Sequence, residues 1–175
     1  MGGVDKGLVK LNGRPLIEHV IARIAPQVTT LMLSANRNLE RYQAYGHPVL
    51  NDQTRHSGPL AGVLCALQQC PSNWLLTVPC DTPYLPEHLV PHICEAAHQT
   101  AARCYTAHDG ERLQPLVSII HRSLLTSLQA YLASGNRRAA LWLKQQATVT
   151  VSFADQAEAF TNINTAAALT QCPSE

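Results

Sequence analysis

Apolar runs with strand character alternate with helical patterns along almost the whole chain, and this alternation limits the possible folds more than any other feature. Strands are expected at residues 28–37, 49–50, 74–78, 102–108, 116–121 and 148–153. Helices are expected at residues 15–25, 59–69, 86–98, 123–134 and 137–147, with a short terminal helix after Asn164. Such alternation is typical of a mostly parallel sheet with helices on both faces. The sequence therefore predicts one three-layer α/β domain over residues 1–175.

The composition fits a compact protein and excludes several function classes. Hydrophobic residues make up 46% of the 175 residues and charged residues 14%, enough for a single core. A formal net charge of +1 supplies no diffuse positive field, so we expect no binding to nucleic acid. The six cysteines form no CxxC or CxxH pair, which favours small buried side chains kept reduced over a metal site. Because no signal peptide or membrane span is recognisable, we expect a cytoplasmic protein without membrane contact.

Polar clusters follow three of the predicted strands. They are Ser34-Ala35-Asn36-Arg37, Asn51-Asp52, and Pro79-Cys80-Asp81-Thr82-Pro83. In open parallel sheets, the loops at the carboxyl ends of the strands converge on a ligand crevice. Asn and Asp are also common turn formers, so each cluster alone has a structural explanation. Their occurrence at three successive strand ends predicts one shared site.

Asp81 is the strongest single candidate in these clusters. It directly follows an apolar strand, with Pro79 and Pro83 fixing the backbone on either side. A carboxylate in this position can hold Mg²⁺ against phosphate oxygens, the other ligands being water and phosphate.

The glycine-rich opening MGGVDKG fits the same chemistry. Gly2, Gly3 and Gly7 would let backbone N–H groups approach a phosphate, and Lys6 would add a positive charge for a leaving pyrophosphate. The alternative is a disordered terminus.

Two further loops have a functional and a structural interpretation. GPLAG, residues 58–62, either presents the helix N-terminus that begins at Gly58 to an anion or base edge, or merely starts the helix. HDGERLQP, residues 108–115, is either a plain hairpin turn at Asp109-Gly110 or a lip over a second ligand.

No Ser or Cys nucleophile with an adjacent base is recognisable in the sequence. The predicted site would instead position phosphates and let an incoming oxygen attack. This favours phosphoryl or nucleotidyl transfer by orientation and charge neutralisation, without a covalent enzyme intermediate.

The motifs MGGVDKGLVKLNGRPL, SANR, GPLAG, PCDTPYLP, HDGERLQPLVSI and FTNINT, in this order, resemble the molybdenum cofactor guanylyltransferases of the MobA type. The resemblance extends over essentially the whole chain and implies a Rossmann-like nucleotidyltransferase fold. It also implies transfer of GMP from GTP to the molybdopterin (molybdenum) cofactor with Mg²⁺, releasing pyrophosphate.

The resemblance assigns roles to particular residues. Lys6 matches a phosphate-binding lysine, Asp52 a GTP-binding acid, and Asp81 the GTP-binding and Mg²⁺-binding aspartate, so Lys6 and Asp81 are the expected catalytic residues. Ser34 stands where some members have an Asn that contacts the nucleotide, and Asn36 matches the pattern. The expected GTP-binding set is Gly2, Gly3, Lys6, Ser34, Asn36, Asp52, Gly58 and Asp81. The expected molybdopterin-binding set is His108, Asp109, Arg112, Asn162 and Asn164.

Members of this family begin with a strand and a loop of the form LAGGxxxRMGGxDKG, and this sequence starts at the Met inside that loop. We therefore expect a start codon assigned too late, so that a central first strand is missing. The alternatives are a molybdopterin cytidylyltransferase, a sugar-phosphate nucleotidyltransferase, or an inactive truncated relic that acts only by binding. We expect a monomer whose partners are GTP, the molybdenum cofactor and proteins of molybdoenzyme maturation.

Overall fold

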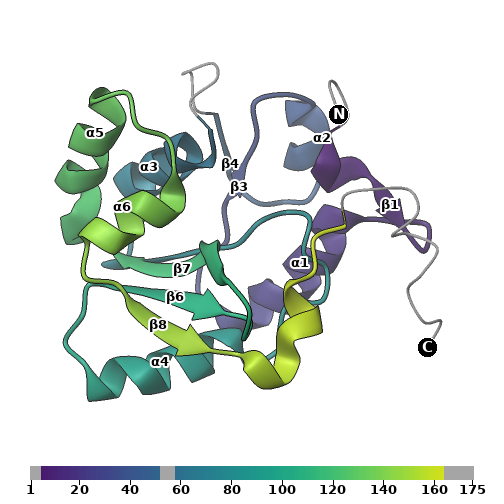
Figure 1. The fold of residues 1–175 in the computed structure, drawn as a ribbon. Coiled ribbons are helices and arrows are strands. Elements are labelled where there is room, and N and C mark those ends of the chain that lie inside the picture. The colour runs from purple at the N-terminus through teal and green to yellow at the C-terminus, as the bar shows by residue number, and fades with distance from the viewer. Residues whose placement is uncertain (1–4, 52–57, 164–175) are drawn as a thin grey trace.

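The computed structural model describes residues 5–51 and 58–163 (Figure 1). Its main sheet has the order β5-β7-β6-β8, formed by β5 (Trp74–Thr77), β7 (Leu113–His121), β6 (Cys104–His108) and β8 (Val149–Ser152). β7 is antiparallel to β5 and β6, whereas β8 is parallel to β6. β5, β6 and β8 therefore point the same way. The predicted α/β class is confirmed, with a mixed sheet in which β7 is reversed.

A short parallel pair forms a second sheet beside the main one. It joins β3 (Leu33–Ser34) to β4 (Val49–Leu50). The sequence predicted a strand over residues 28–37, but only two residues of that run are paired. The predicted strand was therefore too long, since Leu33 and Ser34 pair with Val49 and Leu50 and the rest of the run does not.

The helices surround the main sheet, and most of them match the predicted ranges. They are α1 (Leu16–Ile24), α2 (Leu39–Gln43), α3 (Pro59–Gln69), α4 (Leu89–Gln99), α5 (Leu125–Ala133) and α6 (Ala139–Gln145). Single 3₁₀ turns are η1 (Lys6–Leu8), η2 (Ala25–Gln27) and η3 (Arg122–Leu124), and η4 (Ala154–Phe160) is longer. Pro15 lies just before α1 and not in it, because its backbone is extended, with ψ of 142°. α2 was not predicted.

A tight hairpin near the start of the described chain was also not predicted. β1 (Lys10–Leu11) pairs antiparallel with β2 (Arg14–Pro15) through the two-residue turn Asn12-Gly13. Both turn residues have positive φ, 50° and 80°, which is the conformation that Asn-Gly favours in two-residue hairpins. The hairpin leads directly into α1.

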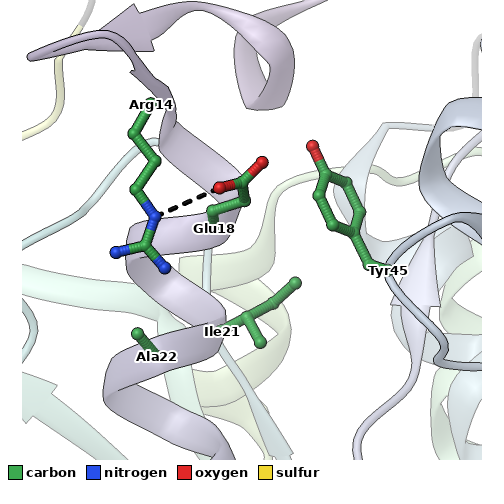
Figure 2. A pocket seen from close by; sticks show the side chains of 5 residues that line it. All are labelled: Arg14, Glu18, Ile21, Ala22 and Tyr45. Atoms are coloured by element: carbon green, nitrogen blue, oxygen red, sulfur yellow. Dashed lines mark hydrogen bonds and ion pairs between the residues drawn. The ribbon is translucent and has the colours of Figure 1, made fainter.

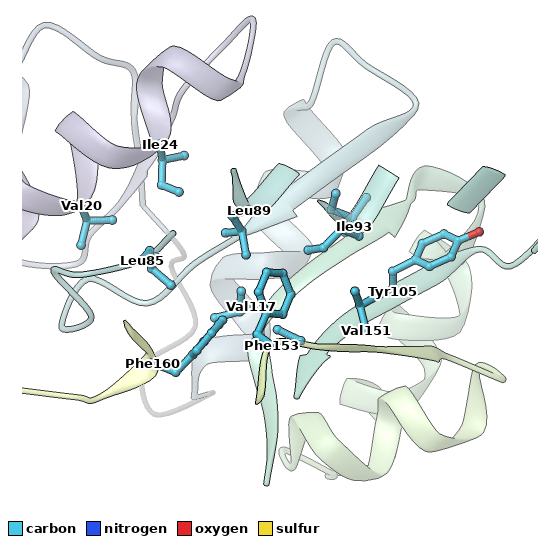
Figure 3. Packing of buried hydrophobic residues seen from close by; sticks show 12 residues of the cluster. Val20, Ile24, Leu85, Leu89, Ile93, Tyr105, Val117, Val151, Phe153 and Phe160 are labelled. Carbon is cyan, nitrogen blue, oxygen red and sulfur yellow. The ribbon is translucent and has the colours of Figure 1, made fainter. Parts of the chain in front are cut away.

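The main sheet separates two apolar clusters, because successive side chains of a strand point to opposite faces. One cluster contains Tyr105, Leu89 and Ile93 of α4, and the contacting rings of Phe153 and Phe160 (Figure 3). On the other face, Cys104 and Ile120 pack against α3, α5 and α6, where Leu67, Leu128 and Trp142 are fully buried. Each such side chain contributes about 1.5–3 kcal/mol by leaving water. Both faces of the sheet are therefore covered, as predicted.

None of the helices within residues 5–51 and 58–163 has the length and apolar character needed to cross a membrane. The predicted terminal helix after Asn164 lies outside the described residues.

Candidate active site

Lys6 and Asp81 form an ion pair. Lys6 lies in η1, and Asp81 lies in the proline-flanked turn that follows β5. The Lys6 Nζ is 3.0 Å from the Asp81 Oδ2. The Lys6 side chain is 48% exposed and that of Asp81 10%, so the carboxylate is largely enclosed while the ammonium group reaches solvent. The structure thus brings together the two residues expected to be catalytic.

The turn that carries Asp81 is held by hydrogen bonds on both sides. The Thr82 hydroxyl donates to the Pro79 carbonyl oxygen at 3.2 Å. The Ile163 N–H donates to the Asp81 carbonyl oxygen at 2.8 Å. This second bond brings the chain next to exposed Asn162 close to the Asp81 turn, whereas Asn164 lies outside the described residues. The carboxylate therefore projects from a backbone that has little freedom to move.

Asp5 links the Lys6 segment to α2 and the residues before it. Its Oδ1 accepts a 2.6 Å hydrogen bond from the Tyr42 hydroxyl, and its Oδ2 accepts one of 2.9 Å from the Asn38 side-chain amide. The Arg37 Nε lies 3.8 Å from the same Oδ2. Burial, followed by the hydrogen bond to charged Asp5, raises the pKa of Tyr42 well above its usual range, so the phenol stays a donor. Asp5, Asn38 and Tyr42 were not among the predicted site residues.

Gly7 and Cys80 lie between the Lys6–Asp81 pair and the contacts that Asp5 makes with Tyr42. A Cβ added at Gly7 would be 2.5 Å from the Tyr42 hydroxyl oxygen and 3.5 Å from the Cys80 Cβ, so only glycine fits without a shift. Burial, with the negative charges of Asp81 and Asp5, raises the pKa of the Cys80 thiol to about 11. Cys80 is therefore a neutral packing residue between the two carboxylates at neutral pH.

The polar ends of β3 and β4 lie side by side, because Ser34 is in register with Leu50. Ser34, Asn36 and Asn51 are exposed there. Two of the three strand ends that carry polar clusters thus lie side by side. Asp52, Gly2 and Gly3 lie outside the described residues. Gly58 immediately precedes α3 with φ of 69°, which explains a glycine at that position.

Residues 108–113 form the hairpin turn between β6 and β7. The buried Asp109 Oδ1 accepts hydrogen bonds from the backbone N–H groups of Glu111 and Arg112, at 2.9 and 2.8 Å. Its Oδ2 accepts from the Gln114 side-chain amide at 2.6 Å, and the Arg112 Nε lies 3.5 Å away. The His108 Nδ1 accepts from the Gly110 N–H. Residues 108–113 thus form a hairpin turn, and the contact of His108, Asp109 and Arg112 with molybdopterin stays a prediction.

The hydrogen bonds of this turn also affect the charge of Asp109. Burial alone would raise the pKa of its carboxyl group. The N–H groups of Arg112 and Glu111, with the Gln114 amide and the Arg112 charge, outweigh burial and lower that pKa to about 2. Asp109 is therefore a structural anion over the physiological pH range.

A shallow cavity of about 280 Å³ lies elsewhere, between α1 and the residues after α2 (Figure 2). It is lined by Arg14, Glu18, Ile21, Ala22 and Tyr45. The Arg14 Nε donates to the Glu18 Oε2 at 3.1 Å, and burial, followed by the Glu18 charge, raises the pKa of Tyr45. None of the predicted site residues that the structure describes lines this cavity.

The residues around Asp81 fit a hard cation that keeps much of its own hydration. Among residues 5–51 and 58–163, no three His, Cys, Asp or Glu side chains gather into a metal cluster. Asp81 offers a carboxylate just after β5, next to the Lys6 cation. Mg²⁺ commonly binds through one or two carboxylates, completing its shell with water and substrate phosphates. The donor set is thus suited to a metal that arrives with a nucleotide and unsuited to a closed structural site.

Known proteins that are similar in sequence belong to the family that the motifs resemble. The family model described as a MobA-like NTP transferase domain matches residues 1–149. A molybdenum cofactor guanylyltransferase of Shewanella putrefaciens is 48% identical over 168 residues, covering 94% of this chain and 85% of that protein. Its counterpart in Photobacterium profundum is 43% identical over 171 residues, covering 98% and 88%.

Solved structures show the same fold at lower identity. Molybdopterin-guanine dinucleotide biosynthesis protein A from Archaeoglobus fulgidus matches with a TM-score of 0.78 and 20% identity, covering 96% of this chain and 88% of that one. The 2-C-methyl-D-erythritol 4-phosphate cytidylyltransferase of Thermus thermophilus matches with a TM-score of 0.73 and 17% identity, covering 96% and 91%. The predicted Rossmann-like nucleotidyltransferase fold is therefore confirmed.

Proposed function

Because the chain belongs to the MobA-like NTP transferase family, we propose that it is a molybdenum cofactor guanylyltransferase. It transfers GMP from GTP to the molybdopterin (molybdenum) cofactor and releases pyrophosphate. The relatives at 43% and 48% identity carry this name, which supports the choice of substrates. Within the molecule the proposal is supported by the Lys6–Asp81 pair, because the cation expected to bind phosphate and the carboxylate expected to bind a metal ion lie next to each other there.

The transfer balances without a covalent enzyme intermediate. An oxygen of the acceptor attacks the α-phosphorus of GTP and forms the new P–O bond. The bond between that phosphorus and the oxygen bridging to the β-phosphate breaks, and its electron pair leaves with pyrophosphate. The Lys6 ammonium group neutralises charge on the β- and γ-phosphates as they leave, which is the usual contribution of a positioned cation to such transfers.

Asp81 would hold Mg²⁺ when the nucleotide binds. The ion, when bound, neutralises phosphate charge and aligns the phosphate chain. The enclosed position of Asp81 and the rigid turn around it favour this role, since a ligand that is already oriented loses little entropy on binding.

The remaining predicted residues complete the site. Ser34, Asn36, Asp52 and Gly58, with Gly2 and Gly3, would contact GTP. His108, Arg112, Asn162 and Asn164 would face the molybdopterin half, with Asp109 shaping the turn that presents its two neighbours. We place the monomeric enzyme in the cytoplasm, where the cysteines among the described residues stay reduced, and expect it to deliver its product to molybdoenzyme maturation proteins.

Nucleotide binding measured by calorimetry with Mg²⁺ tests this proposal directly. The chain should bind GTP more tightly than CTP, and it should release pyrophosphate when molybdopterin is added with GTP. The variant Asp81→Asn should lose transfer, whereas Asp155→Asn, an exposed acid in η4, should behave as the unchanged chain. Tighter binding of CTP would point to a cytidylyltransferase. A folded chain that binds neither nucleotide would point to a non-catalytic role.

A further inference from the structure

Tyr42 is a buried side chain whose polar end reaches the Lys6 segment. It lies in α2 and is 5% exposed. Its hydroxyl donates to the Asp5 Oδ1 at 2.6 Å, and Asp5 immediately precedes Lys6 in the chain. Nothing in the proposed chemistry requires a phenol here, so the contact needs its own explanation.

We propose that Tyr42 is a positioning residue, which acts through Asp5 to fix the segment that presents Lys6 to the nucleotide phosphates. This role rests on the proposed function. In this proposal α2 belongs to the site, because it carries the side chain that positions Lys6.

The first support is the number of contacts that converge on Asp5. Its carboxylate, only 14% exposed, accepts from Tyr42 and from Asn38 and pairs with Arg37. All three partners come from residues 37–42, so one short stretch of chain holds the carboxylate. A hydrogen bond to a charged group of this kind contributes more than one between neutral groups.

The second support is the close approach of Gly7. The Tyr42 hydroxyl oxygen would lie only 2.5 Å from a Cβ added at residue 7. Tyr42 therefore contacts both the residue before Lys6 and the residue after it. The backbone around Lys6 is further closed by the N–H groups of Leu8 and Val9, which donate to the carbonyl oxygens of Asp5 and Lys6 at 3.1 Å.

Loss of the phenol oxygen should affect Lys6 in two ways. The segment loses the shortest of the side-chain contacts that Asp5 makes with residues 37–42, so the ammonium group samples more positions. The Asp5 carboxylate also loses a donor, and, as the neighbour of Lys6, it then competes with the phosphates for the ammonium group. Both effects act on the β- and γ-phosphates and leave the base and ribose contacts unchanged.

The test compares Tyr42→Phe with a matched control, Tyr45→Phe. The control removes the same hydroxyl from a tyrosine whose ring packs edge-on against Tyr42 but whose hydroxyl lines the cavity of Figure 2, near Glu18. Affinities for GTP and GMP are measured by calorimetry, because GMP lacks the phosphates assigned to Lys6. We expect Tyr42→Phe to weaken GTP binding about five- to tenfold and GMP binding by less than about twofold. Tyr45→Phe should change neither.

A double variant shows whether the effect passes through Lys6. In a Lys6→Ala background, Tyr42→Phe should cause no further loss of GTP affinity, since the group that it positions is gone. Equal weakening of GTP and GMP, or a full additional loss in the Lys6→Ala background, would overturn the positioning role. If Tyr42→Phe does not fold, Asp5→Ala, which removes the acceptor of the Tyr42 hydroxyl, should also weaken GTP binding selectively.

Hydrogen exchange supplies a readout that needs no nucleotide. The amides of Leu8 and Val9 should exchange faster in Tyr42→Phe than in the unchanged chain or in Tyr45→Phe. Unchanged exchange at both amides, with unchanged GTP binding, overturns the positioning role while the proposed function stands. A folded, unchanged chain that binds no GTP overturns the proposed function and this role with it.

Discussion

The ammonium nitrogen of Lys6 lies 3.0 Å from the Asp81 Oδ2, across 75 residues of sequence. The pairing keeps a largely enclosed carboxylate next to a cation until a nucleotide enters. The two groups are suited to opposite partners, since the phosphate chain attracts Lys6 and a metal ion attracts Asp81. The contact thus brings together the two charges that, in the proposed function, bind the phosphates and the metal ion of a nucleoside triphosphate.

Asp81→Asn should abolish most of the transfer while keeping the fold. The amide has the shape of the carboxylate but no charge, so it would hold Mg²⁺ poorly and would pair weakly with Lys6. We expect kcat/KM for GTP to fall by at least about a hundredfold, the size of effect seen when a preorganised electrostatic contact is removed. Steady-state pyrophosphate release measures this, with Asp155→Asn as the control. Full activity of Asp81→Asn would remove Asp81 from the catalytic site.

Gly7→Ala should destabilise the Lys6 segment. The new methyl group would lie 2.5 Å from the Tyr42 hydroxyl oxygen, so either the segment or the phenol must move. Overpacking of this kind costs about 1–3 kcal/mol of unfolding free energy. The double variant Gly7→Ala with Tyr42→Phe should regain part of that loss, because the oxygen that clashes is absent. Thermal and urea unfolding measure the stability of both variants. An unfolding free energy of Gly7→Ala equal to that of the unchanged chain would show that the segment accommodates the methyl group.

The fold was largely predictable where local signals agree with burial. The helix over residues 59–69 has the predicted bounds because Gly58-Pro59 marks its start and its apolar residues face the sheet. The strand over residues 28–37 was predicted too long, because pairing depends on the partner and not on the apolar run itself. α2 was missed because five residues are too few to show a helical period.

The sequence identified the candidate residues that follow the strands, but it did not identify the residues that hold them in place. Asp81 stood out because a single acid follows an apolar strand between two prolines. Asp5 and Tyr42 gave no such signal, since their contact joins a loop to an unpredicted helix 37 residues away. Residues that bind ligands leave a pattern in sequence, whereas residues that position them are visible only through long-range contacts.

Cys80 should resist alkylation although it lies next to Asp81. Burial and the nearby carboxylates raise the pKa of its thiol from 9.0 to about 11, so at pH 8 the reactive thiolate is about a hundredfold scarcer than for an ordinary thiol. Cys94 is exposed and should react first. Iodoacetamide labelling followed by peptide mass spectrometry measures the order, with buried Cys104, whose pKa is also raised to about 11, as the slow reference. Labelling of Cys80 at the rate of Cys94 would contradict the enclosed position.

Asp109 should make the stability of the hairpin turn depend on pH. Its carboxyl pKa falls from 3.8 to about 2 on folding, so its charge stabilises the folded chain above pH 4. That contribution is lost as the pH falls from about 4 to about 2. The shift corresponds to about 2 kcal/mol, and screening by water around the exposed neighbours Gly110, Glu111 and Arg112 leaves about 1 kcal/mol of it.

The variant Asp109→Asn removes this charge and keeps one acceptor oxygen for the Glu111 and Arg112 N–H groups, but its amide nitrogen replaces the oxygen that accepts from Gln114. At pH 7 its unfolding free energy in urea should be about 1 kcal/mol below that of the unchanged chain. The difference should narrow steadily below pH 4, because the unchanged chain then loses the same charge. Asp155→Asn, on the exposed η4, should show no such pH dependence. A difference that stays constant from pH 7 to pH 3 would mean that Asp109 acts through the shape of its side chain and not through its charge.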